Sequence, residues 1–188
     1  MIITKQIIDV DEIRILSSLI GSTWVDISGE WLTNEDLSWE SVRIETSRKA
    51  IELSFALEVL DIAGDIDDYP CLHIRESVEK SLKAKKNGQI FYHCRGQSIE
   101  QIWVLRETLT SIRHGEKFFE NTADVSVAFH CGDSWMSFTR AAHFSDVINI
   151  QRTKSKNEIE IPDVLDEWEA DLINQFELSQ EWICIGTV

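Results

Sequence analysis

The chain has 188 residues, 43% apolar and 27% charged, with eight glycines and two prolines. This composition excludes collagen-like and low-complexity classes, and the length predicts a single globular domain over residues 1–188 that needs no disulfides. Asp and Glu number 33 against 18 Lys and Arg, and the net charge of −15 argues against binding to nucleic acid or to an anionic membrane surface.

The first predicted element is a helix over residues 11–19, where apolar side chains recur at spacings of three and four. Either Asp9 or Asp11 can cap its start. Strands are then expected at 24–27, 41–46 and 50–60. The last two are separated by a connection short enough for a hairpin, so we expect them to pair antiparallel. Strict alternation in the third strand places on one face Ile51, Leu53, Phe55, Leu57 and Val59.

The middle of the chain is less uniform. Residues 64–70 indicate an acidic loop, followed by a short strand over 72–74, a helix over 76–86 and a strand over 89–95. The stretch 98–114 is open to two interpretations. Its apolar residues keep helical spacing behind a possible capping box, whereas its threonines and its Trp-Val pair suit a strand. The helical interpretation is favoured.

In the last third, two strands at 124–131 and 134–140 are joined by Gly132-Asp133, a good signal for a two-residue hairpin. The remaining elements are a strand, a helix and a short strand, expected at 147–151, 163–176 and 182–185. Together these patterns predict one α+β domain, mostly antiparallel, with a few helices packed on one face of a sheet.

The four cysteines are widely spaced, which favours reduced core residues over a disulfide framework. The paired turns of a structural zinc site are missing, as are a phosphate-binding loop, a nucleophile elbow and a zinc-protease motif. We therefore expect no cofactor, no metal and no catalytic residues. The alternative is an enzyme or small-ligand domain whose site is assembled from dispersed His, Cys and acidic residues.

The last third of the sequence is acidic, since no Lys or Arg follows Lys156. Anions at the start of a helix are favoured by its dipole, which explains part of this acidity. The rest is either a solvated, solubilising face or a surface for a basic partner. The candidate partner-binding carboxylates here are Asp163, Asp166, Glu167, Glu169, Asp171 and Glu177.

A second acidic cluster contains Asp65, Asp67 and Asp68, whose spacing does not match a twelve-residue calcium loop. Trp31 and Trp39 flank a polar stretch, where exposed aromatic side chains are typical anchors of protein interfaces, although packing in the core is the plainer alternative. These five residues complete the predicted partner-binding set.

In size and acidity the whole chain resembles the bacterial immunity proteins, which share no diagnostic motif. The resemblance implies a protein that binds and neutralises a basic protein, most simply a cognate toxin and possibly a nuclease, whose cationic surface an acidic face complements. Neither a signal peptide nor an apolar stretch of about 20 residues is present, so we expect the protein to act in the cytoplasm.

Overall fold

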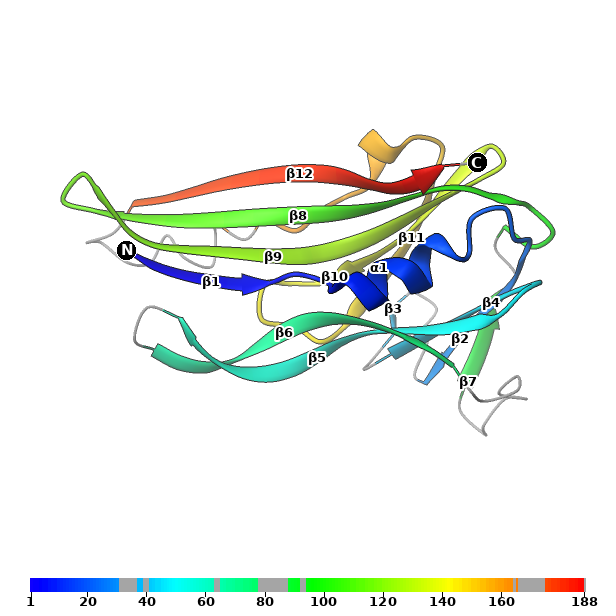
Figure 1. Ribbon diagram of the computed structural model, residues 1–188, viewed down its shortest axis with the longest axis horizontal. Helices are drawn as coiled ribbons and strands as arrows, with labels where there is room; N and C mark the ends of the chain where they lie inside the picture. The colour runs from blue at the N-terminus through cyan, green and yellow to red at the C-terminus, as the bar shows by residue number, and fades with distance from the viewer. Residues whose placement is uncertain are drawn as a thin grey trace.

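The computed structural model describes residues 1–30, 37–38, 41–62, 65–77, 88–91, 94–163, 165 and 175–187. In these residues the chain forms two sheets (Figure 1). The large sheet has the order β12-β8-β9-β10-β11-β3, and β1 pairs in parallel with β9. The small sheet has the order β6-β5-β4-β2-β7, and all its pairs are antiparallel.

The strands of the large sheet are β1 (Ile2–Gln6), β3 (Leu37–Ser38), β8 (Ile99–Arg113), β9 (Glu116–Cys131), β10 (Ser134–Arg140), β11 (Ile148–Thr153) and β12 (Gln175–Thr187). Those of the small sheet are β2 (Trp24–Glu30), β4 (Ser41–Thr46), β5 (Ala50–Ile62), β6 (Asp65–Glu76) and β7 (Gly88–Phe91). A helix, α1 (Val10–Ser17), lies between the sheets, and a 3-10 turn, η1 (Lys156–Glu158), precedes β12 (Figure 1).

The expected α+β fold with several helices is wrong. Of the residues that the structure describes, 68% lie in strands and 8% are helical, and α1 is the one α-helix among them. The main error concerns 98–114, which forms β8 between β9 and β12. Apolar residues occupy both faces of this strand, as Ile102 and Leu105 join different core clusters. Burial on both faces removes the alternation of a strand and imitates helical spacing.

Two further expectations fail at β6 and β12. The predicted acidic loop at 64–70 is largely the first half of β6, which pairs residue by residue with β5. The predicted helix at 163–176 cannot reach its expected end, because Phe176 lies in β12 opposite Ser111. Residue 164 and residues 166–174 of that helix, and residues 78–86 of the helix expected at 76–86, lie outside the described residues.

Several other local predictions are confirmed, but the strand expected at 89–95 does not reach its expected end, because Cys94 and Arg95 lie in a turn, and Glu76, the expected start of a helix, ends β6. Helix α1 begins at a capping box, in which the Asp9 carboxylate accepts from the backbone N–H of Glu12 and the Glu12 side chain accepts from that of Asp9. Strands β4 and β5 form the expected hairpin. So do β9 and β10, where Gly132 adopts φ +62°, a left-handed conformation that glycine accommodates without steric cost.

Two apolar clusters stabilise the sheets. The larger one contains Trp24 from the small sheet, Phe129 and Phe138 from the large sheet, and Leu16 from α1. The smaller one lies on the other face of β8 and includes Leu105, Leu109, Tyr69 and Cys71. A bulge lets β9 contribute to both clusters, because Leu105 pairs with Ser126 whereas Arg106 pairs with Asp124.

Candidate functional site

The ribbon formed by β5 and β6 extends beyond the rest of the small sheet. Strand β4 pairs only with residues 50–54 of β5, so residues 55–62 are paired on one side alone, with β6. Side chains on one face of β5 change from buried to exposed near the point where pairing with β4 stops. Ile51, Leu53 and Phe55 are buried, but Leu57 is 50% exposed and Val59, on the same face, is 70% exposed.

Cross-strand pairing places further side chains on this face. Val59 stands opposite Asp68, and Asp61 stands opposite Ile66, which is 74% exposed. Directly opposed residues in an antiparallel pair point to the same side. We call the set Leu57, Val59, Asp61, Ile66 and Asp68 the hairpin face. Grouped apolar side chains that are exposed among charged ones are typical of interaction surfaces, whereas single ones carry no such meaning.

A buried polar network holds the base of the ribbon on the large sheet. Tyr69, next to the hairpin face on β6, is 1% exposed, and its hydroxyl accepts a 2.9 Å hydrogen bond from Arg140. The Arg140 guanidinium also donates to Glu107 at 3.2 Å and to His143 Nδ1 at 3.2 Å. The other Glu107 oxygen accepts from Gln180 at 2.7 Å. Strands β6, β8, β10 and β12 therefore meet at one guanidinium–carboxylate pair.

Burial controls the ionisation of this network. It raises the pKa of Glu107 above its ordinary value, and Arg140 acts against that rise. Burial also lowers the pKa of His143 to about 3, and the Arg140 charge adds to the effect. His143 is therefore neutral at physiological pH and accepts from Arg140 at Nδ1. The network is a structural anchor because all three groups are almost wholly buried.

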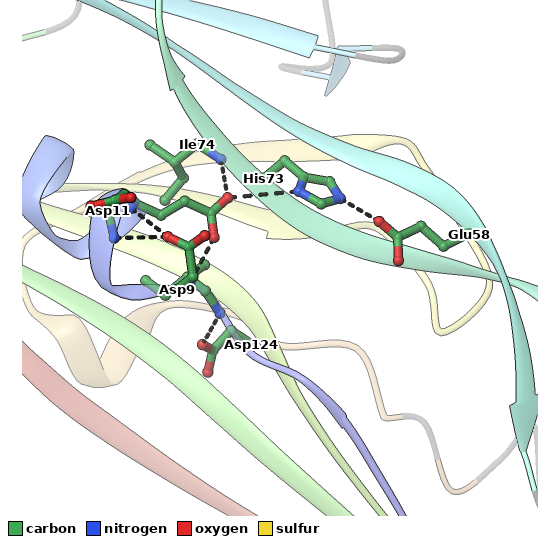
Figure 2. Close-up of polar contacts among 8 residues, drawn as sticks. Asp9, Asp11, Glu58, His73, Ile74 and Asp124 are labelled. Carbon is green, nitrogen blue, oxygen red and sulfur yellow. Dashed lines mark hydrogen bonds and ion pairs between the residues drawn. The ribbon is translucent and has the colours of Figure 1, made fainter.

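A second polar cluster ties α1 to the same ribbon (Figure 2). The Glu12 carboxylate that closes the capping box also accepts from the backbone N–H of Ile74 at 2.9 Å and lies 3.6 Å from His73 Nδ1. His73 Nε2 is 2.9 Å from the Glu58 carboxylate on β5. Strand β6 lies at the edge of the small sheet, where outward backbone N–H groups can pair with a strand of another molecule. The hydrogen bond from the Ile74 N–H to Glu12 of α1 prevents such pairing at this position.

The segment before α1 is fixed by Asp124, which is 2% exposed on β9. Its carboxylate accepts from the backbone N–H of Ile8 at 3.0 Å (Figure 2) and binds Arg106 at 2.8 and 3.0 Å. The ribbon and the N-terminal segment are thus both held rigidly at their bases. A surface held in this way loses little conformational entropy when a partner binds.

Cys71 and His73 share one face of β6, as alternation predicts, but they do not form a nucleophilic pair. Burial, with the Glu58 charge, raises the pKa of Cys71 to about 12, so the thiol stays protonated. Both His73 ring nitrogens face carboxylates. In the described part of the chain, no group of three or more His, Cys, Asp or Glu residues is arranged to hold a metal ion.

The structure brings only part of the predicted partner-binding set to this site. Asp68 lies on the hairpin face, Asp67 lies on the opposite face of β6, and Asp65 begins the strand. Asp163 is exposed, as is Glu177 on β12, where it stands opposite Thr110 of β8. The other predicted residues lie outside the described part of the chain: Trp31, Trp39, Asp166, Glu167, Glu169 and Asp171.

The apolar half of the hairpin face was not predicted from the sequence. Alternation placed Leu57 and Val59 on one face with Ile51, Leu53 and Phe55 and did not distinguish exposed from buried positions along it, and Ile66 fell within the predicted acidic loop. The available signal was length, since β5 has 13 residues and its neighbour β4 has six. A strand that continues well past its neighbour can extend beyond the elements that pack on its face. The continuation of its apolar face is then exposed to solvent.

No protein-family model matches this chain, and no curated protein or solved structure shows significant similarity to it. Among the described residues, no helix has the length and apolar character needed to cross a membrane.

Proposed function

We propose that this chain is a cytoplasmic binding protein that neutralises a cationic protein through the hairpin face, as immunity proteins do with their toxins. The observation that carries the proposal is the alternation of exposed apolar and acidic side chains on one rigidly based ribbon. Val59 is 70% exposed opposite Asp68, and Ile66 is 74% exposed opposite Asp61. Such a surface supplies apolar area for affinity and carboxylates for selection of a basic partner.

The net charge of −15 supports a cationic partner over a second copy of the chain. Two copies that met through the hairpin face would bring Asp61 and Asp68 against like charges, which is costly. A basic partner instead gains from long-range attraction, which raises association rates 10-fold to about 1,000-fold at low salt. Exposed apolar residues of the N-terminal segment lie at the same end of the long axis as the ribbon tip and can enlarge the contact (Figure 1): Met1, Ile2 and Ile3.

The test is capture of the partner from the native cell, or co-purification with the product of a neighbouring toxin gene, using three forms of the full chain. Wild type is expected to retain a basic protein in stoichiometric amount. Val59→Thr/Ile66→Thr is expected to lose at least about tenfold in affinity, as truncation of interface anchors does. The matched control is Val10→Thr, which changes an apolar residue that is 60% exposed on α1.

Binding kinetics at two salt concentrations separate the two halves of the surface. Asp61→Asn/Asp68→Asn is expected to slow association at low salt, because rim charges act on the on-rate. The apolar variant is expected to speed dissociation. Equal affinity of wild type and Val59→Thr/Ile66→Thr for a captured basic protein would refute the hairpin face as the binding surface.

A further inference from the structure

A polar cleft lies at the end of the large sheet opposite to the ribbon tip. It has a volume of about 830 Å³, and its lining residues come from the β9–β10 turn, the end of β11 with the residue after it, and η1. Its lining residues are Asp133, Ser134, Arg152, Thr153, Lys154 and Glu158. The volume is within the range of small-molecule sites, and every lining residue is of a polar or charged type, whereas such sites are lined mostly by hydrophobic and aromatic residues.

Ser134 organises this cleft. Its side chain is almost wholly buried, and its hydroxyl accepts from Arg152 at 3.0 Å and donates to Asp133 at 3.2 Å. The hydroxyl therefore separates the guanidinium from the carboxylate, which would otherwise form an ion pair. Arg152 keeps the rest of its five donors for other partners.

Arg152 and Lys154 carry the positive charge of the cleft. Carboxylates outnumber basic groups nearly two to one, yet neither Arg152 nor Lys154 has a carboxylate within ion-pair distance among the described residues. The acids of the cleft are occupied. Asp133 accepts from Gln97 and Ser134, and the hydrogen bond from Ser134 is the main cause of its lowered pKa. Glu158 accepts from the backbone N–H of Lys154 at 3.1 Å.

We infer that this cleft binds a small oxyanion that also carries hydroxyl groups, with Arg152 and Lys154 as the anion-binding side chains. The planar guanidinium matches the geometry of a phosphate or carboxylate group, and Lys154 adds a point charge beside it. The second oxygens of Asp133 and Glu158 accept hydrogen bonds from ligand hydroxyls. An anion without hydroxyl groups is repelled by the carboxylates of Asp133 and Glu158 and gains no hydrogen bond from them. The lining therefore favours an anion that also carries hydroxyl groups.

The experiment is a titration of the full chain, followed by NMR chemical shifts or calorimetry, with three probes at matched ionic strength. These are inorganic phosphate, glycerol phosphate and tartrate, with sodium chloride as the blank. We expect saturable binding of glycerol phosphate or tartrate that exceeds that of inorganic phosphate. The probe that binds more tightly identifies the oxyanion as phosphate or carboxylate.

Three variants assign the site. Arg152→Gln is expected to weaken binding by about tenfold or more, since a charge-assisted hydrogen-bond pair is lost, and Lys154→Gln by a smaller factor. Lys5→Gln is the control, because Lys5 is an exposed cation on β1 outside the cleft. The inference is overturned if no probe saturates, or if Lys5→Gln weakens binding as much as Arg152→Gln. The result of this titration does not depend on whether the hairpin face binds a protein partner, so either proposal can fail without the other.

Discussion

Replacing Arg140 with methionine removes the guanidinium on which the buried network depends. Arg140 is 2% exposed and Glu107 is 4% exposed, so the variant leaves a buried carboxylate with Gln180 as its hydrogen-bond donor. Removal of one partner from a buried ion pair costs about 3–5 kcal/mol of unfolding free energy. The Tyr69 hydroxyl loses the hydrogen bond from Arg140 at the same time, which weakens the anchor of the ribbon.

The loss of unfolding free energy in Arg140→Met depends on pH, because it depends on whether Glu107 is ionised. Burial already raises the pKa of Glu107, and loss of Arg140 removes the charge that opposes this rise. A group whose folded pKa lies above its unfolded value favours the folded state below the unfolded pKa, and it loses that contribution as pH rises through the folded pKa. The destabilisation of Arg140→Met relative to wild type is therefore larger at pH 7 than at pH 5.

Urea unfolding followed by tryptophan fluorescence measures both quantities. Arg75→Met is the matched control, because Arg75 forms an exposed ion pair with Glu52 and its loss costs less than about 1 kcal/mol. Arg140→Met/Glu107→Gln is expected to regain part of the lost stability, since no uncompensated charge remains. A loss below about 1 kcal/mol for Arg140→Met at pH 7, or the same loss at pH 5, would refute this account of the network.

Three other predictions concern pH, capping and thiols. Burial lowers the pKa of His143 to about 3 from 6.5, so at pH 4 the unfolded chain binds a proton that the folded chain excludes. The unfolding free energy of wild type therefore falls by on the order of 3 kcal/mol between pH 7 and pH 4 through this group, and His143→Asn should lose that much less over the same range. Glu12→Ala should cost about 1–3 kcal/mol in urea unfolding, because Asp9 and Ile74 lose their acceptor, whereas Arg14→Ala should cost under about 0.5 kcal/mol. A thiol reagent should label exposed Cys184 in the native protein and, only after unfolding, the buried Cys71, Cys94 and Cys131; rapid native labelling of all four would contradict the burial.

Local patterns in the sequence were sufficient wherever the decisive interaction is short in range. Asp9, one of the two capping residues that the sequence offered, lies three positions before its capping partner Glu12, and Gly132 sets the turn of its own hairpin. Alternation also placed Cys71 and His73 on one face of β6. In each case the partner group lies within a few residues, so the sequence contains the whole interaction. Net charge belongs to this class as well, and it carries the expectation of a basic partner.

Only the tertiary structure decided the sheets and the candidate surface. Strand β8 was mistaken for a helix because side chains on both of its faces are buried, in two different core clusters, and its neighbour β12 comes more than 60 residues later in the chain. Alternation placed Leu57 and Val59 on the same face as Ile51, Leu53 and Phe55, but it does not identify what covers that face. The exposure of Leu57 and Val59 shows that, beyond Phe55, no element in the described part of the chain covers this face of the ribbon. Burial is a property of distant neighbours, and local spacing does not contain it.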